Sequence, residues 1–153
     1  MLVRDFMTTD LTTLQENESL LDAALIFARS PLRHLPILNA TKLVGIVTDR
    51  DLQHYAPSVL SGIPSEEYNR LMESTPLSRI MTRDPATIRP DSPMSEAAQM
   101  LYDQRIGCLL VVENGELVGI ITTTDMLKLL LNLLRKQDAA PGGLPGQAIE
   151  AGA

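Results

Sequence analysis

The sequence predicts an α/β sandwich (α+β in its layering) built from two copies of one β-α-β-β-α unit. The main observation is that residues 3–55 align with residues 77–129 without a gap, at a constant offset of 74 positions. The most similar segment is a heptapeptide, Gly45–Asp51, which returns as Gly119–Asp125. A fixed period over such a length indicates a duplicated supersecondary unit. One sheet face of each unit would then need cover from its twin.

Composition supports an aliphatic core and limits the classes of partner. Of 153 residues, 44% are apolar but only 3% are aromatic, and tryptophan is absent. A net charge of −6 argues against binding to nucleic acid or to an anionic membrane surface. The single cysteine cannot form an internal disulfide, the N-terminus is too highly charged for a signal peptide, and the apolar stretch Met126–Leu134 is too short to span a bilayer. We therefore expect a soluble, cytoplasmic protein.

The first unit contains the expected elements in order. Residues 3–14 form a short helical lead-in followed by an extended segment. A helix over Leu20–Arg29 begins after Ser19, whose hydroxyl can cap it, with an acid three residues further on. Strands at Leu35–Leu38 and Lys42–Thr48 then form a hairpin, and a second helix begins at a Thr-x-x-Asp motif.

The second unit repeats this order with clearer turn signals. Its first helix begins with Ser92 as the cap and Pro93 in the first turn. Strands at Leu109–Val112 and Leu117–Thr122 flank the dipeptide Asn114-Gly115, which is a strong signal for a tight hairpin turn. The second Thr-x-x-Asp motif then opens the last helix.

The chain therefore divides into four segments. Residues 1–57 form the first unit, residues 58–76 a linker with a short helix starting near Ser65, and residues 77–137 the second unit. Residues 138–153 are rich in alanine, glycine and proline with almost no large apolar residue. Such a composition predicts a disordered tail that contributes nothing to folding or binding.

The last helix has more apolar surface than one sheet face would cover. Its polar residues form a single stripe, whereas leucine and methionine fill most of the remaining surface between Met126 and Leu134. Part of this surface is expected in the core of the unit, and the rest indicates a subunit interface. We therefore predict a homodimer that includes this helix.

The repeated Thr-x-x-Asp motif has two interpretations, and the residues alone leave both open. A threonine followed by an acid at the third helical position is a capping arrangement with a purely structural role. The same geometry suits a nucleotide, because a helix N-terminus attracts phosphate and a carboxylate accepts from ribose hydroxyls. Gly45 and Gly119 would let a ligand or another part of the backbone approach closely.

Three sequence patterns resemble those of one known family. These are Met-Thr-x-Asp, then Arg33-His34-Leu35-Pro36-Ile37, then Leu-Val-Gly-Ile-(Val/Ile)-Thr-x-x-Asp. Over residues 3–135 the chain resembles a tandem pair of CBS domains (a Bateman module), and in length it is similar to bacterial standalone CBS proteins of the acetoin-utilisation type. The resemblance implies two CBS repeats that pack through their sheets with pseudo-twofold symmetry. It also implies two clefts, a flat dimer, and AMP, ADP or ATP as a regulatory ligand, less often S-adenosylmethionine or a dinucleotide.

The resemblance also implies a set of ligand-binding residues. Asp51 and Asp125 would hold ribose in the two clefts, and Thr48 and Thr122 would contact sugar or phosphate. The lead-in to the opposite repeat would close each base pocket. The candidate ligand-binding residues are Thr48, Arg50, Asp51, Arg33, His34, Arg83, Ala86, Thr122, Thr124, Asp125, Thr9, Leu11 and Thr12; Pro85 would lie beside Ala86.

The two repeats differ where phosphate would be bound. Arg33 and His34 would face phosphates, but the second repeat has Gly107-Cys108 at these positions. Arg50 is also confined to the first repeat. A charged hydrogen bond to phosphate is worth about 1.5–3 kcal/mol. We therefore expect polyphosphate nucleotides to prefer the Asp51 cleft, unless Arg33 reaches across to the other one.

Three classes of function remain open from the sequence. The favoured one is a regulatory adenine-nucleotide-sensing module without a catalytic cofactor. The alternative is a ligand-free dimerisation or docking scaffold with the same architecture. An enzyme is not expected, because no acid, base and nucleophile occur together in a recognisable pattern. A metal site is not expected either, because His34 and His54 lack ligands at suitable spacing. The sequence does not indicate which protein target is regulated.

Overall fold

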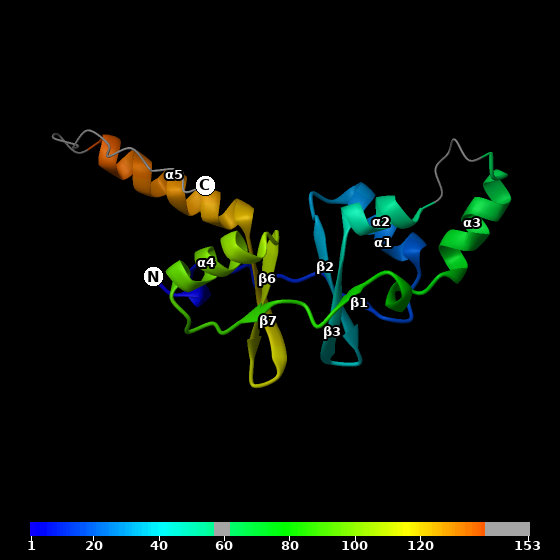
Figure 1. Cartoon of the computed structure of the whole chain (residues 1–153), viewed down its shortest axis with the longest axis horizontal. Coiled ribbons are helices and arrows are strands. Elements are labelled where there is room, and N and C mark those ends of the chain that lie inside the picture. Colours follow the sequence, from blue (N-terminus) through cyan, green and yellow to red (C-terminus); the bar gives the residue numbers. More distant parts are fainter. Residues whose placement is uncertain (57–61, 140–153) are drawn as a thin grey trace.

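A computed structural model describes residues 1–56 and 62–139, and the structural statements below concern these residues. Figure 1 shows two β-hairpins side by side with their turns pointing the same way, and helices gathered toward the other end of each hairpin. Each hairpin belongs to one of the two units. The mixed α/β fold class with two units is therefore confirmed.

The first sheet has the strand order β1-β2-β3-β4. Strand β1 (Leu14–Gln15) runs parallel to β2 (His34–Asn39), which pairs antiparallel with β3 (Lys42–Thr48). The outer strand β4 (Thr82–Arg83) pairs antiparallel with β3, although it lies beyond the linker in sequence. The helices of this half are α1 (Leu20–Arg29), α2 (Asp49–Tyr55) and α3 (Ser65–Ser74).

The second sheet has the order β5-β6-β7. Strand β5 (Thr87–Ile88) runs parallel to β6 (Cys108–Glu113), which forms a hairpin with β7 (Glu116–Thr122). Both turn residues of this hairpin, Asn114 and Gly115, have positive φ, as a two-residue primed turn requires. Helices α4 (Met94–Gln104) and α5 (Thr123–Asp138) complete this half.

The two lead-in segments are exchanged between the units. In the first lead-in (residues 1–8), the helical turn η1 (Val3–Asp5) packs on the second unit, where the N–H of Val3 donates to the carbonyl of Ser92 at 2.9 Å. In the second lead-in (residues 77–83), the turn η3 (Leu77–Arg79) packs on the first unit, where the N–H of Leu77 donates to the carbonyl of Glu18 at 2.8 Å. Each unit is therefore completed by chain from the other half.

The core follows the same exchange. Val3 is fully buried among residues of β5, α4, β6 and β7, while Leu77 is fully buried among residues of α1, β2 and β3. A third and smaller apolar cluster, formed by Ile46, Cys108 and Leu110, lies between the two sheets. Burial of this cluster helps to hold one sheet against the other.

The exchange also explains the glycine of the repeated heptapeptide. A Cβ at Gly45 would lie 2.7 Å from Sδ of Met81 and 2.9 Å from the carbonyl oxygen of Thr82. At Gly119 it would lie 2.6 Å from Sδ of Met7. From the sequence, either a ligand or another part of the backbone could approach these glycines. The structure places another part of the chain there. In both halves, therefore, the repeated Met-Thr pair contacts the repeated glycine.

Two sequence-based expectations need correction. Ser92 was expected to cap the first helix of the second unit, but α4 begins at Met94 because Pro93 is still extended, with φ −68° and ψ 147°. The first strand of the first unit is also shorter than the expected extended segment, because β1 covers only Leu14–Gln15. The expected tail falls outside the described residues apart from residues 138–139. The division of the chain into domains remains a prediction.

Helix α5 leads away from the rest of the molecule (Figure 1). Met126 and Leu129 pack on the core of the second unit, but no residue of the helix is fully buried. Despite its leucine content, neither α5 nor any other helix in the described part of the chain combines the length and apolar character that a membrane crossing requires.

Candidate functional site

A hollow of about 190 Å³ lies between the two units at the first Thr-x-x-Asp motif. The first unit contributes residues from β2, β3 and the start of α2. The remaining wall comes from the chain around β4 and from the beginning of β6 in the second unit. The lining residues of this inner hollow are His34, Ile46, Thr48, Asp51, Thr82, Pro85, Ala86, Ile106, Gly107, Cys108 and Leu110.

An outer hollow of about 480 Å³ shares His34, Thr48 and Gly107 with the inner one. It adds four polar or charged side chains, and its lining is Arg33, His34, Thr48, Asp49, Arg50, Gln53 and Gly107. Small-molecule pockets usually measure about 300–1,000 Å³. The inner hollow alone is therefore small for a ligand, whereas the two together, here called the Asp51 cleft, reach that size.

The Thr-x-x-Asp motifs form complete helix caps in both units. The N–H of Thr48 donates to Oδ2 of Asp51 at 2.8 Å, and the N–H of Asp51 donates back to Oγ1 of Thr48 at 3.1 Å. Thr122 and Asp125 repeat these bonds at 2.9 and 3.3 Å. The capping interpretation is thus confirmed, and it uses only Oδ2 of each aspartate.

The second carboxylate oxygen differs between the two motifs. Among the described residues, no side-chain hydrogen bond engages Oδ1 of Asp51, which lies at the wall of the cleft. In the second motif, Nζ of Lys128 lies 3.8 Å from Oδ1 of Asp125. Asp51 can therefore keep its cap and still accept a hydrogen bond from a ligand.

The basic side chain expected to face phosphate already has a partner. Nη1 of Arg33 donates to Oδ2 of Asp49, which is the first residue of α2. This hydrogen bond is the main reason that the pKa of the Asp49 carboxyl lies below its usual value. The other oxygen of Asp49 accepts from the N–H of Arg50 at 2.9 Å. Asp49 is thus ionised, and both of its carboxylate oxygens accept hydrogen bonds.

His34 occupies the space that a side chain at position 107 would need. A Cβ on Gly107 would lie 2.8 Å from Nε2 of His34. The departure of the second repeat from the pattern therefore has a structural reason, because the ring extends across to the other unit. Burial lowers the pKa of His34, and the carboxylates of Asp49 and Asp51 only partly oppose this effect. The ring is consequently biased toward its neutral form.

Part of the cleft wall is apolar, and the residues that form it were not among the candidates named from the sequence. Ile46, Cys108 and Leu110 come from the cluster between the sheets and also line the inner hollow. Burial raises the pKa of the Cys108 thiol to about 12, so the thiol stays protonated. The strand alternation of the two hairpins could have identified these residues, because they lie on the sheet face turned toward the other unit.

Residues 82–86 line the cleft with a set that differs in part from the one expected. Ala86 and Pro85 are in the wall as expected, and Thr82 is there too. Arg83 is not among the lining residues. It pairs with Gly45 in the sheet, and its Nη2 donates to the carbonyl of Ser78 at 3.4 Å. Strand alternation directs Thr82 and Arg83 to opposite faces.

The residues expected at the second cleft lie where the exchange brings the first lead-in to β7. Thr8 pairs with Ile120 in the same way that Thr82 pairs with Ile46. Thr9 and Thr12 are exposed beyond this bridge, Leu11 is half-buried, and Thr124 is exposed in the first turn of α5. Their role in a second binding site remains a prediction.

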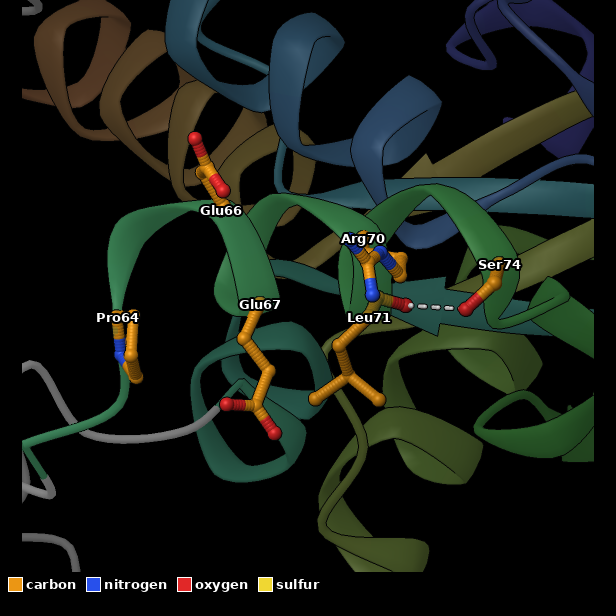
Figure 2. Close-up of a pocket in the computed structure, with 6 residues that line it drawn as sticks. All are labelled: Pro64, Glu66, Glu67, Arg70, Leu71 and Ser74. Atoms are coloured by element: carbon orange, nitrogen blue, oxygen red, sulfur yellow. Dashed lines mark hydrogen bonds between the residues drawn. The ribbon is translucent and has the colours of Figure 1, made fainter.

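A further hollow lies on the outer surface of α3. Figure 2 shows its lining residues, with Glu66 and Glu67 pointing in different directions and Oγ of Ser74 donating to the carbonyl of Leu71. All of the lining comes from Pro64 and α3, and none of the expected site residues is among them. Within residues 1–56 and 62–139, moreover, no three potential metal-ligating side chains lie close enough together to hold an ion.

Comparison with known protein families and sequences agrees with the two-unit fold. The family model described as CBS domain matches residues 3–58 and again residues 77–132. A CBS domain-containing protein of Dictyostelium discoideum is 32% identical over 135 residues, covering 87% of this chain and 93% of that protein. A homoserine O-acetyltransferase of Methanohalobium evestigatum is 29% identical over 130 residues, covering 84% of this chain but only 24% of the enzyme. This chain thus spans about a quarter of that relative.

Solved structures share the fold over most of their length. A Vibrio cholerae protein assigned by name to acetoin utilization (AcuB) is 35% identical with a TM-score of 0.73, covering 92% of this chain and 97% of that one. A CBS domain pair in complex with 5′-methylthioadenosine and S-adenosyl-L-methionine is 29% identical with a TM-score of 0.71, covering 87% and 98%. CBSX2 in complex with AMP is 28% identical with a TM-score of 0.72, covering 88% and 98%.

Proposed function

We propose that this chain, which belongs to the CBS domain family and carries two CBS domains, is a regulatory module that binds an adenosine-containing ligand in the Asp51 cleft. The observation that carries the proposal is the cleft itself, whose wall combines an available carboxylate oxygen of Asp51 with apolar residues from both units. Support also comes from two solved relatives, one in complex with AMP and one with 5′-methylthioadenosine and S-adenosyl-L-methionine.

Each part of an adenosine ligand has suitable groups in the cleft. Oδ1 of Asp51 would accept from the ribose hydroxyls, as carboxylates do in dinucleotide sites. The base would lie against Ile46 and Leu110, where burial of its faces is favourable. A 5′ substituent would extend into the outer hollow past His34 and Thr48. The nucleotides AMP, ADP and ATP are the proposed class.

The position of the cleft favours regulation over catalysis. Residues from both units form its wall, so a ligand there would bind the two units to each other and stabilise one relative arrangement. The acetyltransferase relative does not extend the proposal to its reaction, because this chain covers only 24% of that enzyme. We propose that the signal passes to another protein in the cytoplasm, whose identity the chain does not indicate.

Calorimetry and thermal unfolding test this proposal. Adenosine, AMP, ADP, ATP, 5′-methylthioadenosine and S-adenosylmethionine would be titrated separately into the wild-type chain. A ligand present at about 100 times its dissociation constant should add roughly 2.7 kcal/mol to the free energy of unfolding.

The matched variants are Asp51→Asn and Asp103→Asn. The amide introduced by Asp51→Asn keeps one oxygen for the helix cap but changes the group that faces the ligand, so at least a tenfold loss of affinity is expected. Asp103 is exposed on α4, where it accepts from Gln99, and its variant should bind like the wild type. Equal binding by all three proteins would place the ligand elsewhere.

The second candidate is a dimerisation or docking scaffold that binds no ligand. It is favoured by one observation, the exposed leucines of α5, which include Leu127, Leu130, Leu131 and Leu134. We propose that this surface forms a homodimer contact in either case. A chain that dimerises but gives neither heat nor stabilisation with all six adenosine compounds would be a scaffold.

A further inference from the structure

We propose that Asp49 limits the number of phosphates that the Asp51 cleft accepts, so that the cleft selects adenosine derivatives with at most one phosphate over di- and triphosphates. This inference rests on the proposed function and narrows its ligand class. It is opposite to the preference expected from Arg33, His34 and Arg50 alone. The preference depends on what these side chains contact, not on how many basic residues the sequence contains.

The first step concerns the place where phosphates would lie. The base would lie against the apolar wall of the inner hollow, which shares His34, Thr48 and Gly107 with the outer hollow. A chain of phosphates leaving the nucleoside by this route enters the space lined by Arg33, Asp49 and Arg50.

The second step is the charge of that space. In the outer hollow two guanidinium groups, Arg33 and Arg50, face one carboxylate, that of Asp49, and Asp51 adds a second carboxylate from the adjoining inner hollow. His34 adds little positive charge near pH 7, because burial lowers its pKa. The cleft as a whole therefore carries no excess of positive charge to attract a triphosphate, despite its three basic side chains.

The third step is the ion pair between Arg33 and Asp49. The Arg33 side chain is 73% exposed, whereas that of Asp49 is 23% exposed. A phosphate that recruited Arg33 would leave the more buried Asp49 without its partner and beside a second anion. Both effects oppose binding, and the repulsion increases with each added phosphate.

The fourth step is the lack of free backbone donors at the start of α2. The N–H of Asp49 donates to the carbonyl of Arg33 at 3.2 Å, and the N–H of Arg50 donates to Oδ1 of Asp49. The N–H of Asp51 donates to Thr48. These three amides therefore offer a phosphate no compensation for the carboxylates around it.

The second unit shows that the fold does not need this carboxylate. Thr123 lies at the position equivalent to Asp49, and its N–H donates to the carbonyl of Gly107 at 3.0 Å, as that of Asp49 does to Arg33. The cap formed by Thr122 and Asp125 is complete without an acid there. Replacement of Asp49 by threonine should therefore leave the fold intact and release Arg33.

The test compares phosphate number in the wild-type chain and in Asp49→Thr. Adenosine, AMP, ADP and ATP are titrated by calorimetry without divalent cations, which would mask phosphate charge. The wild type is expected to bind adenosine and AMP at least tenfold more tightly than ATP. In Asp49→Thr, ATP affinity should rise at least tenfold while adenosine affinity changes less than twofold. Asp49→Asn should behave in the same direction.

Two controls assign the effect to this cleft and this charge. The double variant Asp49→Thr/Asp51→Asn should bind ATP at least tenfold more weakly than Asp49→Thr alone, because both side chains act on a ligand in the same cleft. Asp91→Asn removes a carboxylate from an exposed ion pair with Arg89, away from the cleft, and should leave the order of affinities unchanged.

The remaining outcomes would refute either the role of Asp49 or the proposed function. ATP binding as tight as adenosine in the wild type, or an unchanged order in Asp49→Thr, would refute the role of Asp49 while leaving the proposed function intact. If no adenosine compound binds to the wild type or to either variant, the proposed function fails, and the inference fails with it.

Discussion

At the scale of single residues, two of the differences between the repeats are explained by neighbouring side chains. Gly107 replaces the equivalent of Arg33 because the ring of His34 lies over it. Asp49 replaces the equivalent of Thr123 and engages Arg33. These substitutions concentrate charge and bulk on one side of an otherwise duplicated structure. Gly107 is thus explained by a contact between the repeats, and Asp49 by its ion pair with Arg33 within the first repeat.

Stability should depend on pH through His34. Burial lowers the pKa of this imidazole in the folded chain below its unfolded value of about 6.5. Below that value the unfolded chain binds more protons than the folded one, so the free energy of unfolding should fall as pH decreases from about 7.5 to about 5. The lowered pKa of Asp49 acts in a separate and more acidic window, because its stabilisation is lost only as the pH falls below about 3.8.

Urea unfolding of His34→Gln at several pH values checks this prediction. The variant should lose part of the difference in stability between the two ends of that pH range. His54→Gln is the matched control, since His54 is exposed on α2, and it should keep the wild-type pH dependence. If His34→Gln keeps it as well, protonation of His34 does not oppose folding.

At the scale of elements, local patterns predicted the helices and hairpins well, because their signals lie within a few residues of one another. The Asn114-Gly115 turn and both Thr-x-x-Asp caps are examples. The exchange of lead-ins was not predictable in this way, because it joins residues such as Val3 and Ser92 that are far apart in sequence. The ion pair between Arg33 and Asp49 was not predicted from local patterns either. It makes the charge of the cleft different from what the number of basic residues implied.

Because the lead-ins are exchanged, we predict that each one stabilises the unit on which it packs. Val3→Ala should leave a cavity in the second unit, and Leu77→Ala should leave one in the first. The expected losses are about 2–5 kcal/mol for Leu77→Ala and less for Val3→Ala, which removes fewer atoms. Hydrogen exchange measured by mass spectrometry should show faster exchange in β6 and β7 for Val3→Ala, and in β2 and β3 for Leu77→Ala.

Ser95→Ala, at an exposed position on α4, is the control and should leave exchange in both sheets unchanged. Faster exchange of β2 and β3 in Val3→Ala, with β6 and β7 unaffected, would contradict the exchanged packing. Equal acceleration in all four strands would show instead that the two units open together.

At the scale of the whole molecule, the chain connects its halves in three ways. The lead-ins cross over, the small cluster of Ile46, Cys108 and Leu110 joins the sheets, and the Asp51 cleft takes its wall from both units. A ligand in the cleft would therefore act on the relation between the units. Helix α5 is the part of the described chain least involved in these connections, since it extends outward with its leucines exposed (Figure 1).

The final prediction is that this exposed surface of α5 mediates self-association. Leu127, Leu130, Leu131 and Leu134 follow the spacing i, i+3, i+4, i+7 and so form one stripe, in which each residue is between 44% and 60% exposed. A contiguous apolar stripe of this kind usually marks an interaction surface. The double variant Leu130→Glu/Leu134→Glu should therefore shift the wild-type dimer to monomer in light scattering, while circular dichroism remains unchanged. Asn132→Glu/Lys136→Glu introduces the same residues at exposed polar positions of the same helix and should remain dimeric. A leucine variant that is folded and still dimeric would remove α5 from the interface, and a monomeric wild type would refute self-association itself.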